Sequence, residues 1–239
     1  MKAEALAKQM MQSRHAYPCS CCVNCGAEQE PGTSSVVWFS DTSVTLAKCR
    51  ICNERLDPFV ELEFPLIALE LMLHRVPAFR HVVRNRQLGI SIWIRFALVI
   101  NFIEVLAHFW ITRRDPTPQE VLQHLLESLL VFIASCASFA MAGSLFLRKE
   151  LSHELMLCEV RALILSRFPS VLLVIAMTWW FPSDFYPVIA LYTFSTSLAA
   201  ARALPDVDSL IKAILIACFG VAPRLARMGL FTRPIQLHL

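Results

Sequence analysis

The sequence predicts a small all-β ribbon held together by four cysteines, followed by an α-helical domain that spans a membrane several times. Two observations predict this fold class. Two Cys-x-x-Cys pairs lie in the first 52 residues, and 56% of the 239 residues are apolar while only 17% are charged. The mean hydropathy of +0.54 is higher than a soluble domain of this size needs in order to form its apolar core. A lipid bilayer is therefore the expected environment of the second part.

The N-terminal tail, residues 1–18, carries charges throughout and lacks an uninterrupted apolar core of signal-peptide length. We therefore expect the cysteines that follow to stay in the reducing cytosol, where disulfides are rare. Six of the nine cysteines lie within residues 19–52. This clustering favours a local metal site over a disulfide framework.

Cys22 and Cys25 form one pair and Cys49 and Cys52 the other, with the spacing that lets two thiolates of one tight turn reach the same zinc ion. Cys19 and Cys22 have the same spacing, but no glycine follows Cys22. Such a four-thiolate site is closed to water and substrate. We expect one structural zinc ion that takes no part in catalysis.

The predicted zinc ribbon occupies residues 19–64. Gly26 and Asn53 directly follow the two cysteine pairs, where a turn often needs a positive φ. Between the pairs, two β-rich runs flank Asp41-Thr42 and predict a hairpin. A third strand is expected next, because apolar and acidic residues alternate there. The three expected strands are residues 36–40, 43–47 and 59–64.

A basic segment, residues 65–87, joins the ribbon to the membrane domain. Its first part, residues 65–73, is apolar but too short to span a bilayer. We expect an interfacial helix with its basic end among lipid headgroups. The alternative is a buried helix that docks the ribbon onto the membrane helices. The residues expected to contact headgroups or a partner are His74, Arg75, Arg80, His81 and Arg84.

The predicted transmembrane domain covers residues 88–223, and residues 224–239 form a C-terminal tail. Four runs are long enough to cross about 30 Å of hydrocarbon as helices. A fifth apolar stretch, residues 208–221, is shorter and contains Lys212, so it either spans the membrane or lies re-entrant or interfacial. The arginine-rich connections predict that the ribbon faces the cytosol. The four runs are residues 88–111, 122–147, 162–181 and 185–204.

Three ionisable residues inside these runs, Glu104, His108 and Arg167, are candidates for a polar site within the membrane. A carboxylate in lipid needs a partner, and Arg167 is the candidate partner of Glu104; binding and packing roles are both open. The chain has only six glycines and shows no nucleophile elbow or phosphate-binding loop. We expect no catalytic residues and no enzymatic activity.

The order of these motifs resembles the homology domain of the Arv family. The resemblance rests on the two cysteine pairs, on Leu-Asp-Pro-Phe-Val-Glu at 56–61 and on Leu-His-Arg-Val-Pro-Ala-Phe-Arg-His-Val-Val-Arg-Asn at 73–85. It covers residues 22–85, and the helical remainder only by architecture. It implies an endoplasmic-reticulum membrane protein of sterol and sphingolipid homeostasis and of early glycosylphosphatidylinositol (GPI) anchor synthesis.

Two functions follow from the resemblance. The chain binds or moves membrane lipids, whether sterol, sphingolipid or a GPI precursor, or it is a non-catalytic scaffold or accessory subunit of the GPI N-acetylglucosaminyltransferase machinery. Small residues in the second and fourth runs permit close helix contacts and serve either function. Nucleic acid is not an expected partner, because the net charge is only +3 and no continuous basic stripe is present.

Overall fold

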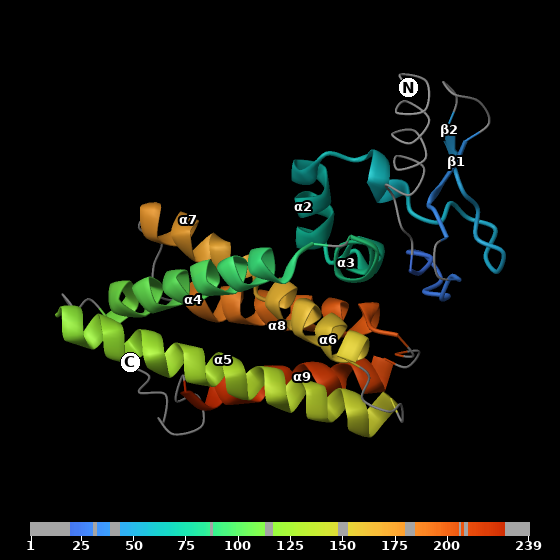
Figure 1. Cartoon of the computed structure of the whole chain (residues 1–239). Helices are drawn as coiled ribbons and strands as arrows, with labels where there is room; N and C mark the ends of the chain where they lie inside the picture. Colours follow the sequence, from blue (N-terminus) through green and yellow to red (C-terminus); the bar gives the residue numbers. More distant parts are fainter. Residues whose placement is uncertain are drawn as a thin grey trace, which may run out of the picture. The chain divides into compact units, whose positions relative to one another are not determined.

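A computed structural model of the chain is shown in Figure 1. The chain divides into two compact units, Met1–Leu88 and Gly89–Leu239. The first contains short strands and short helices, and the second is built of long helices. The structure describes residues 20–30, 33–38, 44–86, 88–112, 117–147, 153–179, 185–205, 207 and 210–227.

The N-terminal unit contains the predicted hairpin in shortened form. Strand β1 (Val36–Trp38) pairs antiparallel with β2 (Val44–Leu46), and Val36 lies opposite Leu46. Residues 39–43, which include the expected turn at Asp41-Thr42, lie outside the described residues. In the described part of this unit these are the only strands, so turns and short helices make up most of the predicted all-β ribbon.

The strand expected at residues 59–64 is wrong, because this stretch begins with a 3-10 helix, η1 (Pro58–Glu61). Proline at the first helical position has a suitable fixed φ and needs no hydrogen-bond acceptor for its nitrogen. The Asp57 carboxylate caps the turn by accepting the Phe59 N–H at 3.2 Å. These two local effects override the alternation of side chains that suggested a strand.

Three short helices follow: α2 (Phe64–Met72), α3 (Val76–Arg80) and the π-helix η2 (His81–Asn85). Helix α2 buries Ile67 and Leu71 and packs on α3. The chain then reverses at His74, whose φ is +56°. Helices α3 and η2 bury Phe79 and Val83, so this region has a packed core of its own.

The C-terminal unit begins with α4 (Ile90–Thr112) and α5 (Pro118–Leu147). Thr117 starts α5 with a reciprocal cap, in which its hydroxyl accepts the Glu120 N–H at 3.3 Å and the Glu120 carboxylate accepts the Thr117 N–H at 2.8 Å. Within these helices, Ile90–Trp110 and Pro118–Phe139 are long and apolar enough to cross a bilayer. They match the first two predicted spans.

The third predicted span, residues 162–181, is not one continuous helix. Helix α6 (His153–Ser166) ends before a 3-10 turn, η3 (Phe168–Val171), which leads into α7 (Leu172–Thr178). Pro169 explains the break, because it has no N–H to donate to the preceding turn and disfavours helical geometry at Phe168. The Ser166 hydroxyl donates to the Leu163 carbonyl at 2.7 Å and satisfies part of the open helix end.

The last two helices are α8 (Phe185–Ala203) and α9 (Leu210–Arg227). Their apolar parts, Val188–Ala203 and Leu210–Phe219, are shorter than the roughly 20 residues of a usual span. Helix α8 packs on α6 and α9, and α9 runs beside α5 (Figure 1). Small buried side chains let these helices approach closely: Ala199, Ala200, Ala203, Ala213 and Ala217. By length alone, two of the four predicted spans are supported.

Candidate metal centre and supporting network

Both cysteine pairs fold into the same backbone turn. The Gly26 N–H donates to the Cys22 carbonyl at 2.9 Å, and the Asn53 N–H donates to the Cys49 carbonyl at 3.0 Å. A bond from the N–H of each leading cysteine to the carbonyl five residues later closes each turn, at 2.9 and 2.8 Å. Gly26 and Asn53 have φ angles of +80° and +60°. The positive φ predicted after each pair is therefore confirmed.

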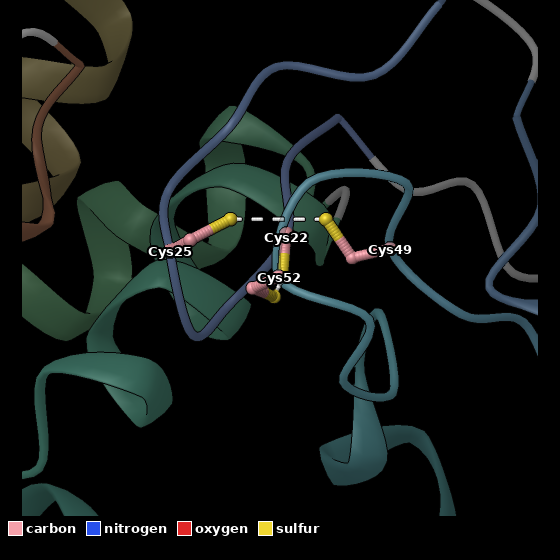
Figure 2. A group of neighbouring side chains, drawn as sticks. All are labelled: Cys22, Cys25, Cys49 and Cys52. Carbon is pink, nitrogen blue, oxygen red and sulfur yellow. Dashed lines mark hydrogen bonds between the residues drawn. The ribbon is translucent and has the colours of Figure 1, made fainter.

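The two turns face each other and bring four sulfur atoms together (Figure 2). Cys22 Sγ lies 3.7 Å from Cys52 Sγ, and Cys25 Sγ lies 3.7 Å from Cys49 Sγ. All four sulfurs lie within 4.8 Å of one another. With Zn–S bonds of about 2.3 Å, sulfurs at the corners of a regular tetrahedron would lie about 3.8 Å apart. The donor set and its spacing therefore fit a zinc ion.

Burial and hydrogen bonds shift the pKa values of the cysteine thiols in opposite directions. Burial raises the pKa of the Cys22 and Cys25 thiols, because it removes water from around the charged thiolate form. Burial acts in the same direction at Cys49, but the N–H groups of Cys52 and Ile51 and the neighbouring thiols bring its pKa down to about 7. N–H groups aimed at a sulfur stabilise the thiolate that a metal requires.

Two arginines from α3 and η2 hold the first turn. Arg80 donates to the backbone carbonyls of Val23 and Asn24. Arg84 donates to the Gly26 carbonyl at 3.3 Å and lies 3.4 Å from a Glu28 carboxylate oxygen. Four thiolates around one Zn²⁺ would carry a net charge of −2, which these guanidinium groups would partly offset.

A buried polar network ties this turn to the rest of the unit. Asp57 Oδ2 accepts from His81 Nδ1 and from Asn85 Nδ2, each at 2.8 Å. Asn85 Oδ1 accepts the N–H groups of Ser20 and Cys21 at 3.0 Å, and its amide nitrogen donates to the Cys21 carbonyl at 3.0 Å. Asp57 is fully buried. The network joins three segments that are distant in the sequence.

Replacing Asp57 with asparagine is expected to destabilise the N-terminal unit by about 2–3 kcal/mol. An amide has one acceptor oxygen, which cannot serve the Phe59 N–H as well as His81 and Asn85. The measurement is hydrogen exchange of the backbone amides of residues 20–28 in the zinc-loaded chain. Asn24→Ala is the matched control, since the Asn24 side chain is exposed, and its effect should stay within about 0.5 kcal/mol. Equal protection in Asp57→Asn and the original chain would contradict the proposed role of the network.

Gly26→Ala is expected to destabilise the first turn by about 1–2 kcal/mol, because a side chain disfavours a positive φ. The added methyl group would also lie 3.2 Å from the Arg80 guanidinium. Gly89→Ala is the control, because a methyl group there would lie 3.8 Å from Ser91 Oγ, an ordinary van der Waals distance. Competition with a chromogenic chelator should show weaker zinc retention for Gly26→Ala alone; equal retention in both variants would contradict the expectation.

The structure gives internal roles to three of the five residues expected to contact headgroups. His81 is buried against Asp57, and Arg80 and Arg84 bind the first cysteine turn. His81 is only 6% exposed, and its contact with a lipid headgroup or partner stays a prediction. Arg75 remains on the surface beside Glu70, at 3.8 Å, and His74 forms the reversal after α2.

In the C-terminal unit, the expected partnership of Glu104 and Arg167 is present. Arg167 Nη2 forms an ion pair with Glu104 Oε2 and donates to Asn101 Oδ1 at 3.1 Å. Glu104 Oε1 also accepts from the Ser170 hydroxyl at 2.7 Å. The Ser128 hydroxyl donates to Asn101 Oδ1 at 3.0 Å, which adds α5 to the cluster. The cluster therefore joins α4 and α5 to the break between α6 and α7.

His108 takes part in a different group. Its ring centroid lies 4.9 Å from that of His124 in α5 and 5.6 Å from that of Phe109. His124 Nδ1 in turn lies 3.3 Å from a Glu127 carboxylate oxygen. The three predicted polar residues thus divide between the Glu104 cluster and a histidine pair.

Asp57, Asn85 and Asn101 were not predicted to belong to any site. Asp57 and Asn85 lie in the two motifs that carry the family resemblance, and this position was the feature of the sequence that could have pointed to them. Cys19 lies outside the described residues. Cys21 is buried, its backbone pairs with Glu28 in an isolated β-bridge, and its sulfur is not one of the four in the cluster. The pairing of Cys22 with Cys25 is therefore the one that the structure contains.

Fold and site together define a mostly helical membrane protein with an N-terminal cluster of four cysteines at metal-binding distances. A sequence model described as the Arv1-like family matches residues 21–204. The chain belongs to the Arv1-like family.

Relatives extend this match over most of the chain. It is 25% identical to "Protein arv1 homolog" of Dictyostelium discoideum, over 91% of the chain and 98% of the relative. It is 24% identical to "Protein ARV 2" of Arabidopsis thaliana, over 83% of the chain and 88% of the relative. "Protein ARV 1" of the same plant is 36% identical over 64 residues, 27% of the chain and 25% of the relative. No solved structure matches significantly.

Proposed function

We propose that the protein acts in lipid homeostasis of the endoplasmic-reticulum membrane, where it binds or moves a sterol, a sphingolipid or a GPI-anchor intermediate. The family match across both units carries this proposal, because it includes the metal centre and most of the membrane helices. The exposed apolar surface of α4 and α5 supports it, since only 33% and 11% of their spanning windows are buried. Such surface suits contact with lipid.

The proposed topology has four spans, α4, α5, α6 with α7, and α8, with the zinc-loaded unit in the cytosol. Arg84 and Arg86 precede α4, and Arg161 and Arg202 lie near the ends that would return to the same side. The break at Arg167–Ser170 is compatible with a span, because irregular backbone is tolerated in a membrane where protein buries it. Glu104 and Asn101 surround that break. Helix α9 would then lie re-entrant or interfacial.

The proposed role is non-catalytic. The four-thiolate centre would hold its metal with no open position, so zinc would stabilise the fold of the N-terminal unit. In the C-terminal unit, the carboxylate of Glu104 is occupied by an ion pair and a hydroxyl.

A scaffold for the GPI N-acetylglucosaminyltransferase machinery is the alternative, and the surface of α5 favours it. Leucine and isoleucine side chains recur along one side of this helix at helical spacing, each more than half exposed: Leu122, Leu126, Leu130 and Ile133. A partner helix could pack against this stripe as well as lipid could.

Native mass spectrometry of the full chain, purified in mild detergent from its source membrane, separates the two functions. A bound lipid at one copy per chain without protein partners is expected for lipid handling. Stoichiometric glycosyltransferase subunits would support the scaffold instead. A transfer assay between donor and acceptor vesicles then tests whether the chain moves lipid. The first proposal would be overturned if the chain neither bound a specific lipid nor transferred one.

A further inference from the structure

Helix α2 carries an apolar face that the N-terminal unit does not cover. Leu66, Leu69 and Leu73 are 49%, 53% and 56% exposed. Leu66 and Leu69 lie on one side of the helix, and Leu73, the C-cap residue, follows Leu69 by four residues on the same side. Ile67 and Leu71, on the other side, are only 2% and 4% exposed. Helix α2 is thus anchored through one apolar face and presents a second one outward.

The chain connection shows which surface lies within reach of this face. Asn85 ends η2, and the window that can cross a bilayer begins at Ile90. Four intervening residues span at most about 14 Å when extended. If α4 crosses the bilayer, the N-terminal unit is therefore held close to the headgroup layer. An exposed leucine face on a unit tethered there has a lipid surface as its nearest apolar environment.

The charges around α2 indicate what kind of attraction acts. Glu61 and Glu63 precede the helix and are exposed, while Arg75 follows it. Arg86 lies over the Phe64 ring at 6.0 Å. Acidic and basic groups are thus mixed around the leucines. Contact with a bilayer would depend mainly on apolar burial, with little help from anionic lipid and little sensitivity to salt.

We propose that Leu66, Leu69 and Leu73 form a membrane-contact face that inserts at the lipid–water interface and holds the zinc-binding unit against the bilayer. This inference rests on the proposed membrane span of α4. It assigns the contact to side chains of α2, whereas the arginines of α3 and η2 bind the cysteine turn. Transfer of one half-exposed leucine into apolar surroundings raises the equilibrium constant for docking about fivefold.

Photo-crosslinking tests the proposal in the full zinc-loaded chain, reconstituted in nanodiscs of zwitterionic phosphatidylcholine. Benzoylphenylalanine replaces Leu69 in one sample, Phe102 of α4 in a second and Val37 of β1 in a third. Phe102 and Val37 are 47% and 43% exposed, which matches Leu69. Phosphatidylcholine adducts are expected at positions 69 and 102 and not at 37. Adduct yield at 69 should change little between low and high salt.

Each other outcome has a distinct meaning. Adducts at 102 without adducts at 69 would overturn the contact face and leave the membrane span intact. No adduct at either position would overturn the span as well. Cross-links from 69 to peptides of α4–α9, or to a co-purified protein, would show that a helix or a partner covers the leucines. Equal yields at 69 and 37 would also contradict the proposal.

A second variant tests the leucines themselves. With the photo-reactive residue at position 73, Leu66→Ser with Leu69→Ser is expected to lower the lipid adduct by about tenfold or more, since two apolar contacts are lost. Ile67 and Leu71 still anchor the helix, and zinc content checks that the unit stays folded. An unchanged adduct in a zinc-loaded double variant would overturn the proposal.

Discussion

Cys49→Ser is expected to release the metal and unfold most of the N-terminal unit. A serine hydroxyl is a poor zinc ligand, and the remaining three thiolates would leave an open, charged site. In small zinc domains the binding free energy is about 10–16 kcal/mol and is available only to the folded state. Metal analysis after dialysis and hydrogen exchange of residues 20–64 measure the two effects. Cys52→Ser should behave in the same way.

Cys218→Ser is the matched control, because Cys218 is an exposed cysteine of α9 in the other unit. This variant should keep one zinc ion per chain, and its backbone amides should exchange as slowly as those of the original chain. Stoichiometric zinc in both Cys49→Ser and Cys52→Ser would show that the four sulfurs are not the ligands.

Glu104→Gln is expected to destabilise the C-terminal unit by about 3–5 kcal/mol, because it leaves the Arg167 guanidinium without its counter-ion in a largely buried place. Arg167→Met should cost a similar amount through the unpaired Glu104 carboxylate. The double variant should cost less than the sum of both, because no isolated charge remains. Thermal unfolding in one detergent measures all three.

Glu127→Gln is the control for these variants. Its carboxylate is 43% exposed and contacts Gln123 and His124 of its own helix, so its loss should change stability by less than about 1 kcal/mol. Additive effects of Glu104→Gln and Arg167→Met would contradict a direct ion pair.

Features that depend on local sequence were predicted well. Each cysteine turn is set by a few consecutive residues, so spacing and the following Gly26 or Asn53 were sufficient. The hairpin and the boundaries of α4 followed from local patterns too. The alternation in residues 59–64 misled, because Pro58 and the Asp57 cap favour a helical turn over a strand.

Features that depend on distant contacts were harder to predict. Asp57 and Asn85 are 28 residues apart, and nothing in either segment alone shows that a π-helical turn brings them together. Arg80 and Arg84 looked like surface cations for the same reason. The partner of Glu104 could be anticipated only because a buried carboxylate requires one.

The link from Asn85 to Ser20 and Cys21 has a consequence for synthesis of the chain. During translation both cysteine turns leave the ribosome before Asn85 does, and domains fold as their residues emerge. The turns can bind zinc early, but the hydrogen bonds between Asn85 and Cys21 can form only after residues 81–85 have left the ribosome. The next segment to emerge is α4. Completion of the N-terminal unit and emergence of the first helix that is long and apolar enough to cross a bilayer are therefore neighbouring events in the synthesis of the chain.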